Sequence, residues 1–299
     1  MYNYFRQYNE NKEIIDQKKF YRKFSNEREF GGSYKGIDHL VYSRHFETFG
    51  HIINGILRCK PKRIIDMGCG NGVNLPISRL FPEIEYHAID YAEKTIHAAQ
   101  EDYSNINFQC NDAFQTSFKD KSFDFAIMQS LMIIYKKNED YLALLKEASR
   151  ILTDEGILAL VVWNESPLLK YSVEISRFFG KIMGQKIPRD FNGMLFSERD
   201  IKKIVKKSQM QIEQVIHTGV NMGILQSIQF LNFSKYNRKF GESERQSVIK
   251  HPQNILKDIQ VQAGGFSALI GFLYHISKIN PQWFGMYSIY FISKKKISS

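Results

Sequence analysis

The sequence predicts an α/β fold: a doubly wound, mostly parallel seven-stranded sheet with a helical N-terminal segment and helical insertions. From Lys62 onward, five short apolar runs alternate with helix-like stretches, and this order builds a parallel sheet with right-handed crossovers. Two further strand-like runs lie in the C-terminal third of the chain. A hydrophobic fraction of 43% over 299 residues is sufficient for an ordinary packed core.

Each strand is expected where an apolar run ends in glycine, proline or polar residues. The seven expected strands are Arg63–Asp66, Tyr86–Asp90, Ile106–Cys110, Phe123–Met128, Ile157–Trp163, Met210–His217 and Tyr287–Ser293. The intervening patterns predict three helices, at Leu75–Phe81, Ala92–Asp102 and Tyr141–Leu152. Pro82 is expected to close the first of these helices and Gly156 to stop the third.

The rest of the chain has a helical pattern and divides into three further regions. Residues 1–57 are expected to form a helical cap or lid, residues 58–165 the α/β core, and residues 166–208 a helical insertion. Residues 209–299 carry the last two strands, with a helical insertion at about 221–282, because some 65 residues are too many for a plain hairpin loop. The individual helices are expected at Asn11–Phe24, Tyr42–Arg58, Ser197–Ser208, Ser247–Val261 and Gly265–Ile279.

Composition favours a soluble cytoplasmic protein. No secretory signal or membrane-spanning stretch is visible in the sequence. Cys59, Cys69 and Cys110 show no CxxC spacing, so we expect buried thiols in a reducing compartment and no metal site. The formal net charge of +10 is unevenly distributed, with −6 on residues 61–165 and +12 on residues 166–299.

The loop after the first strand reads Asp66-Met67-Gly68-Cys69-Gly70-Asn71-Gly72. Glycine takes positive φ without strain and has no Cβ to block a ligand, so this loop suits a sharp turn with a ligand against its backbone. The dinucleotide fingerprint G-x-G-x-x-G would need a further glycine where Val73 stands. This departure argues against NAD and FAD.

Acidic residues follow three successive strands: Asp66 closes the first, Asp90 closes the second and Asp112 follows the third. The carboxyl ends of parallel strands open on the same side, so these carboxylates should line one crevice. Asp90 is suited to accept ribose hydroxyls, Asp112 with Ala113 to read an adenine edge, and Asp66 to take an amino group. Three carboxylates repel pyrophosphate and favour a cationic nucleoside such as S-adenosylmethionine.

Residues of about 60–165 resemble the class I S-adenosylmethionine-dependent methyltransferases, in particular the broad type 11, small-molecule group. The glycine loop matches the family's first motif, Ala88-Ile89-Asp90-Tyr91 the second and Asn111-Asp112-Ala113 the third. The segments Ser122-Phe123-Asp124, Leu145–Leu152 and Gly156-Ile157-Leu158 match the following strands and helix. The resemblance implies a Rossmann-like methyltransferase fold and the cofactor contacts Asp66, Met67, Gly68, Cys69, Gly70, Asn71, Asp90, Tyr91, Asn111, Asp112, Ala113, Gln129 and Ser130.

The acceptor is indicated less directly than the donor. The fourth strand ends in Gln129-Ser130-Leu131-Met132 and lacks the Asn/Asp-Pro-Pro-Tyr/Phe tetrapeptide of the amino-methylating DNA enzymes. Methyl transfer needs a base only for some nucleophiles, and the weak candidates are His39, His45 and His217. Weak candidates for acceptor binding are Tyr34, Tyr42, Trp163 and Asn164. We expect O-methylation of a small metabolite, glycan or natural product.

Two alternatives use the helical regions differently. In the first alternative, the chain is an RNA or protein methyltransferase that uses its basic C-terminal region. In the second, it is a cofactor-binding protein without turnover. In Ser197–Ser208 one face carries Arg199, Lys202, Lys203, Lys206 and Lys207. That pattern is most often a solvated surface, with an RNA or anionic-lipid patch as the alternative. The segment Phe266–Tyr274 is read first as packed core and second as a wall of the acceptor pocket.

Overall fold

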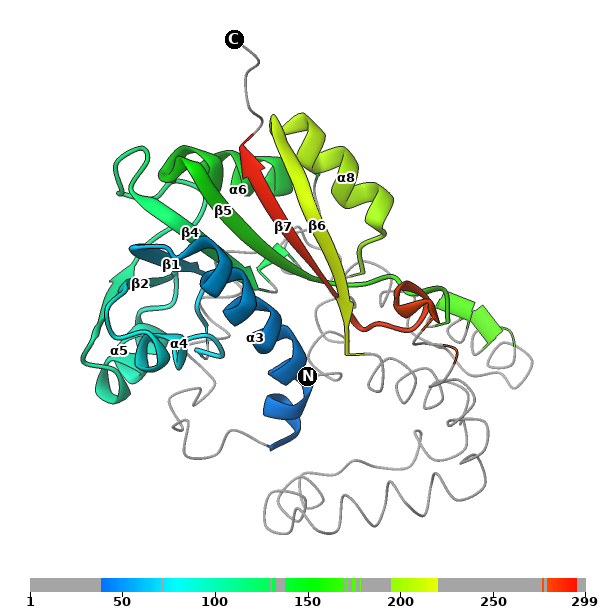
Figure 1. The fold of residues 1–299 in the computed structure, drawn as a ribbon, viewed down its shortest axis with the longest axis horizontal. Coiled ribbons are helices and arrows are strands. Elements are labelled where there is room, and N and C mark those ends of the chain that lie inside the picture. Colours follow the sequence, from blue (N-terminus) through cyan, green and yellow to red (C-terminus); the bar gives the residue numbers. More distant parts are fainter. Residues whose placement is uncertain are drawn as a thin grey trace, which may run out of the picture.

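In the computed structural model, residues 39–70, 72–129, 131–132, 138–168, 195–219 and 279–294 are described, together with residues 170, 171, 174, 175, 178 and 276. The fold class is confirmed: one seven-stranded sheet has the strand order β3-β2-β1-β4-β5-β7-β6. Strands β1 to β5 pair with one another in parallel, and β7 runs antiparallel between β5 and β6. Figure 1 shows this twisted sheet with helices packed against it.

The sheet consists of β1 (Arg63–Met67), β2 (Glu85–Asp90), β3 (Ile106–Cys110), β4 (Phe123–Gln129), β5 (Leu152–Trp163), β6 (Met210–Thr218) and β7 (Tyr287–Lys294). The helices are α3 (His39–Cys59), α4 (Ile77–Leu80), α5 (Glu93–Asp102), α6 (Asn138–Ile151), α8 (Glu198–Lys207) and the 3-10 turn η4 (Pro281–Trp283). All seven expected strands are present within one or two residues at their ends, except the start of β5.

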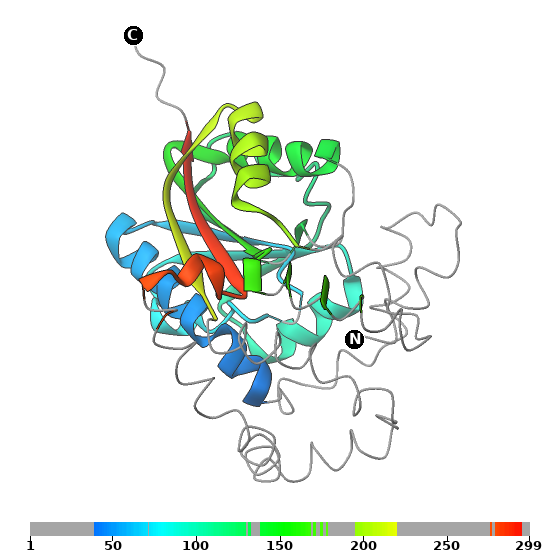
Figure 2. The same ribbon diagram turned by 90° about the vertical axis from the view of Figure 1, so that its right-hand side faces the viewer.

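Two cores lie on opposite faces of the sheet because side chains alternate along each strand. In β1, Ile65 packs with the residues of α6 and α8, whereas Ile64 packs with those of α3 and α5. The same alternation runs through β4, where Phe125 and Ala126 belong to opposite cores. Figure 2 shows α6 and α8 on one side of the strands and α3 on the other. Burial on both faces explains why the strand sequences are almost continuously apolar.

The helix ends differ from expectation at two places. Helix α4 covers only Ile77–Leu80, because the residues before it form turns that bring the glycine loop back to the sheet. Gly156 was wrongly expected to stop the helix before β5: α6 ends at Ile151 and β5 begins directly at Leu152. Between Leu152 and Ile157 the pairing with β4 shifts register. A Cβ on Gly156 would lie 3.0 Å from Leu152 Cβ, so close packing in this irregularity favours glycine.

The cysteine prediction was partly wrong. Cys69 is buried, but Cys59 at the end of α3 and Cys110 at the end of the edge strand β3 are exposed, and these three described cysteines form no disulfide. Within the described ranges, no helix is long and apolar enough to cross a membrane.

Several sequence predictions lie outside the described residues: the helices at 11–24 and 247–261, all of the helix at 265–279 except residues 276 and 279, residues 179–194 of the insertion at 166–208, and the segment 266–274. Helix α8 matches the expected Ser197–Ser208 helix, and Ser197 Oγ caps it by accepting a hydrogen bond from Asp200 N at 3.2 Å. Helix α8 packs on β6 and α6.

A charged network ties α6 to the loop before β4. Glu147 is 8% exposed, and its Oε1 accepts hydrogen bonds from Thr116 N (2.7 Å) and Thr116 Oγ1 (2.6 Å). Arg150 donates to Glu147 at 2.9 and 2.7 Å and to Asp120 Oδ1 at 2.6 Å. Burial raises the pKa of Glu147, but the hydrogen bonds from Arg150 and Thr116 outweigh it and leave the pKa below its ordinary value.

Replacing this carboxylate should destabilise the fold. Glu147→Gln is expected to lower the free energy of unfolding by about 2 kcal/mol at neutral pH, because it removes the more buried of the two carboxylates that pair with the Arg150 guanidinium. The folded-state pKa is depressed, so this stabilisation is present at neutral pH and is lost as the pH falls through it. Urea unfolding at about pH 7 and at about pH 4 should therefore show the gap between variant and parent narrowing in acid.

The matched control is Glu155→Gln, which removes an exposed carboxylate in the first residues of β5. Its unfolding free energy should stay within about 0.5 kcal/mol of the parent. A Glu147→Gln variant as mild as this control would contradict the role assigned to the network.

Candidate functional site

The glycine loop begins where β1 ends, at the carboxyl edge of the sheet. Gly68 N and Cys69 N both donate to Ile89 O, at 2.8 and 2.9 Å, so the first turn of the loop is bonded to the end of β2. Gly68, Gly70 and Gly72 have φ of +73°, +47° and +75°, values that favour glycine. The loop therefore turns through a left-handed backbone directly over the sheet edge.

The glycines differ in what surrounds them. A Cβ on Gly68 would lie 2.8 Å from Leu131 Cδ1, so Gly68 makes room for the residues that follow β4. A Cβ on Gly70 would meet no atom closer than Gly68 O at 3.9 Å. Among the described residues, the space in front of Gly70 is therefore open, and a side chain there would fill the room that a ligand needs against the backbone.

Asp90 is the central acid of this edge. Asp90 is only 5% exposed. It is therefore a buried acid and not an acid in a surface turn, whose presence would need no functional explanation. Its Oδ2 accepts a hydrogen bond from Gly70 N and its Oδ1 one from Ala92 N, both at 2.9 Å. Burial raises the pKa of Asp90, and the backbone donors oppose part of this rise. Asp90 thus joins the glycine loop to the start of α5.

Asp66 lies at the end of β1 and is 1% exposed. Among the described residues, its Oδ2 has no hydrogen-bond partner, and the same holds for Asn74 Oδ1. Burial raises the pKa of Asp66 to about 7; the side chains of Asn74 and Tyr86 oppose the rise, and the nearby carboxylate of Asp90 adds to it. A buried acid without a donor for one of its oxygens is costly to the fold unless a ligand supplies that donor.

Asp112 lies one strand further along the same edge. Asn111 N donates to Asp90 O at 3.0 Å, which places the segment after β3 next to the end of β2. Asp112 Oδ1 accepts from Phe114 N at 3.0 Å, so this carboxylate also shapes the local turn. Asn111 donates through Nδ2 to Ser117 Oγ at 2.8 Å and accepts from Asp112 N at 2.9 Å.

The structure therefore brings the three predicted strand-end acids to one edge. The side chain of Met67 is fully buried in the core, so only its backbone reaches the loop. Ala113 is 8% exposed, and Gln129 ends β4, which is the other neighbour of β1. Asn71 and Ser130 lie outside the described residues.

The other weak candidates with described side chains lie at or near the carboxyl ends of β5 and β6, on the same edge of the sheet but beyond β4. His217 lies in β6, four strand positions from β1, about 19 Å at the usual strand spacing. Its Nδ1 pairs with Ser288 Oγ at 2.9 Å, and burial lowers its pKa while Glu198 offsets part of that fall. Asn164 Nδ2 donates to Gln282 O and Gly285 O, at 3.1 and 3.0 Å, and Trp163 packs edge-on against Tyr287.

Four other candidates lie outside what the structure describes. Tyr34 precedes the described residues, and the side chains of His39, Tyr42 and His45 at the start of α3 are not described. Two neighbours of Asp66, Asn74 and Tyr86, were not among the site residues predicted from the sequence. The periodicity of β2 could have placed Tyr86 on the core side, but nothing in one sequence marks it as a neighbour of Asp66.

Part of this core is similar to proteins of known family. Residues 64–156 match the family model described as "Methyltransferase domain". "Demethylmenaquinone methyltransferase" of Thermotoga maritima is 26% identical over 147 residues, 49% of this chain and 61% of that protein. "Malonyl-[acyl-carrier protein] O-methyltransferase" of Bacillus cereus is 42% identical over 53 residues, 17% of this chain and 20% of that protein. The chain thus spans at most about three fifths of these relatives.

Two solved structures share the fold over most of their length. A putative sarcosine dimethylglycine methyltransferase from Galdieria sulphuraria aligns with a TM-score of 0.52 at 15% identity, covering 94% of this chain and all of that one. The PH0226 protein of Pyrococcus horikoshii aligns with a TM-score of 0.50 at 17% identity, covering 66% and 93%. Over residues 64–156, which include the glycine loop and its neighbouring strands, the chain is thus similar to methyltransferase domains, and the two solved structures share its fold.

Proposed function

We propose that this protein transfers the methyl group of S-adenosylmethionine to an oxygen atom of a small molecule. The observation that carries the proposal is Asp66: a buried carboxylate with an oxygen that lacks a donor among the described residues, next to a second buried carboxylate, Asp90. Such a pair favours a cationic ligand that brings its own hydrogen-bond donors. The open space over Gly70 leaves room for that ligand against the backbone.

Each acid has a proposed partner on the cofactor. Asp66 Oδ2 would accept from the ammonium group of the methionine part, and the two oxygens of Asp90 would accept from the ribose hydroxyls. Both Asp90 oxygens already hold a backbone N–H, but a carboxylate oxygen has a further lone pair for a second donor. Asp112 and Ala113 would contact the adenine. Asn71, Tyr91, Asn111, Gln129 and Ser130 complete the proposed set, and residues 1–57 would form a cap over it.

Methyl transfer requires the protein mainly to position the donor and the acceptor. The cofactor supplies a methyl group on a positively charged sulfur, and in-line transfer to an acceptor hydroxyl leaves a neutral thioether and releases the hydroxyl proton. The chain's part is to hold the donor with Asp66 and Asp90, to align the acceptor, and to exclude water. No fixed base is required when the acceptor is acidic enough to lose its proton.

The names of the curated relatives support a small acceptor and, in one case, transfer to oxygen. Incubation with methyl-labelled S-adenosylmethionine and a cell extract should place the label in the small-molecule fraction, as an ether or ester. Label in the RNA or protein fraction would instead favour the alternative acceptors, and a protein that binds the cofactor without transferring label would favour the non-catalytic alternative.

Asp90→Asn should weaken S-adenosylmethionine binding by about 30-fold to 100-fold, because the amide presents one acceptor oxygen in place of two to the ribose hydroxyls. Isothermal titration calorimetry measures the change, with thermal unfolding as a check that the loop still folds. Asp102→Asn, an exposed acid at the end of α5, is the matched control and should bind as the parent does. Unchanged affinity in a folded Asp90→Asn protein would contradict the proposed role.

The affinity should also depend on pH through Asp66. Below its pKa of about 7 this acid is protonated in the cofactor-free protein, so binding of the ammonium group should weaken by up to about tenfold for each further pH unit. Asp66→Asn should bind weakly and show a flatter profile over the same range. The cofactor's own titration affects both proteins equally. If the affinity of the parent therefore depends on pH no more steeply than that of Asp66→Asn, Asp66 does not bind the ammonium group.

The raised pKa of Asp66 also affects the stability of the cofactor-free protein. The folded-state pKa of Asp66 is raised above its unfolded value, so its contribution to stability falls as the pH rises from about 4 to about 7 and stays low above that. Asp66→Asn removes this loss, and thermal unfolding should therefore show the variant more stable than the parent at about pH 8. A variant less stable than the parent there would contradict the buried, unpartnered state of Asp66.

A further inference from the structure

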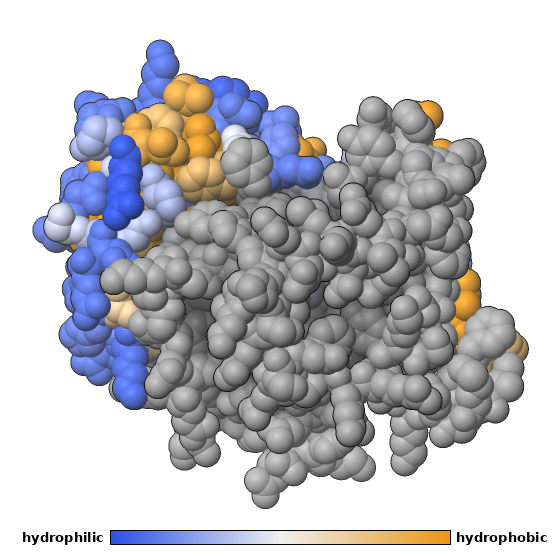
Figure 3. Space-filling model, turned by 90° about the horizontal axis from the view of Figure 1, so that it is seen from below, coloured by the Kyte–Doolittle hydropathy of each residue, from blue (hydrophilic) through white to orange (hydrophobic). Residues whose placement is uncertain are grey.

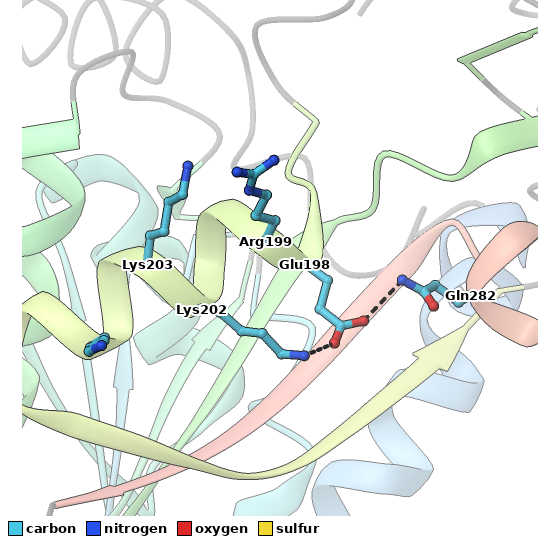
Figure 4. A pocket seen from close by; sticks show the side chains of 6 residues that line it. Glu198, Arg199, Lys202, Lys203 and Gln282 are labelled. Carbon is cyan, nitrogen blue, oxygen red and sulfur yellow. Dashed lines mark hydrogen bonds and ion pairs between the residues drawn. The ribbon is translucent and has the colours of Figure 1, made fainter.

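The outer face of α8 carries a concentration of positive charge that the proposed active site does not use. Its exposed cations are Arg199, Lys202, Lys203, Lys206 and Lys207, whereas Ile201, Ile204 and Val205 are buried against the sheet. Together with Gln282 of η4, residues of this face line a shallow groove of about 480 Å³ (Figure 4). The five cations are called the basic face below.

The acids of α8 do not neutralise this face. Asp200 is held at the helix start by Ser197 Oγ, which donates to its Oδ2 at 2.6 Å. Glu198 accepts from Lys202 at 2.5 Å and from Gln282 Nε2 at 3.0 Å. Within the described part of the chain, no ion pair engages Arg199, Lys203, Lys206 or Lys207. Figure 4 shows Arg199 and Lys203 extending from α8 on the side away from the strands.

Exposed apolar side chains lie next to the basic face. Ile279 is 85% exposed and Trp283, which ends η4, is 49% exposed. The bond from Gln282 to Glu198 holds η4 against the start of α8, and Asn164 fixes the same turn through Gln282 O and Gly285 O. Figure 3 shows a few hydrophobic residues at the right-hand edge of the molecule.

We propose that the basic face and the adjoining Ile279 and Trp283 form a docking surface for an anionic phospholipid bilayer. The phosphate and carboxylate groups of such a surface attract the lysines and the arginine, with about fivefold in partitioning for each cation near the surface. The interfacial zone below the headgroups takes up indole and aliphatic side chains. This pairing of cations with an exposed aliphatic residue distinguishes a bilayer from a nucleic acid, whose bases would stack on Trp283 but offer no apolar phase to Ile279.

The surface does not rest on the proposed methyl transfer, so the test uses the full protein without cofactor. Co-sedimentation with phosphatidylcholine vesicles containing phosphatidylserine should show binding that falls as salt is raised, and pure phosphatidylcholine vesicles should bind far less. Lys203→Glu/Lys206→Glu should reduce binding more than tenfold. Lys62→Glu/Lys119→Glu makes the same charge change at exposed positions before β1 and β4 and should reduce it much less.

The apolar half of the surface has its own readout. Trp283→Ser should weaken vesicle binding several-fold, and it should abolish the fluorescence shift of the parent on binding, because the other tryptophan, Trp163, packs against Tyr287. Absence of vesicle binding, or equal losses in the two charge-reversal variants, would overturn the proposal. A third result would also overturn it: single-stranded RNA displaces the protein from vesicles, and Trp283→Ser leaves the vesicle affinity unchanged. The basic face would then be a nucleic-acid interface.

Discussion

The carboxylate of Asp90 is the interaction on which the arrangement of the cofactor edge depends. It receives Gly70 N on one oxygen and Ala92 N on the other, so a single side chain fixes both the glycine loop after β1 and the start of α5. Without it, two backbone donors near a buried edge would lose their acceptor. The backbone bonds from Gly68 and Cys69 to Ile89 complete the join between the first two strands. The position of Asp66, and with it the proposed ammonium site, follows from this frame.

Strand order explains why these acids meet at all. β1 lies between β2 and β4, so the connection after β1 leads to β2 on one side, whereas the connection after β4 leads to β5 on the other. Loops that diverge in this way leave a crevice at the carboxyl edge, the usual ligand position in open α/β sheets. The antiparallel pair β7 and β6 extends the far side of the sheet and carries α8 and η4 with it. The proposed donor site and the proposed bilayer surface therefore occupy different parts of one sheet.

Much of this could be predicted from the sequence, because burial on both faces gives the strands continuous apolar runs and the acids stand at strand ends. Asp66, Asp90 and Asp112 were placed correctly for that reason. The role of Gly156 could not be predicted, because glycine is favoured both at a helix stop and at a close contact such as that with Leu152. The sequence does not distinguish these two roles. Nor could the involvement of Asn164 with η4 be predicted, a contact between positions more than a hundred residues apart. Asn74 becomes a neighbour of Asp66 through the turns after the glycine loop, and Tyr86 through the pairing of β2 with β1.

The central claim concerns the ligand of Asp66 and Asp90, and a crystal structure of the protein with S-adenosylhomocysteine tests it most directly. The account predicts the amino group within about 3 Å of Asp66 Oδ2 and the ribose hydroxyls on the carboxylate of Asp90. Binding at another edge of the sheet, or in this crevice with both carboxylates facing away from the ligand, would contradict it.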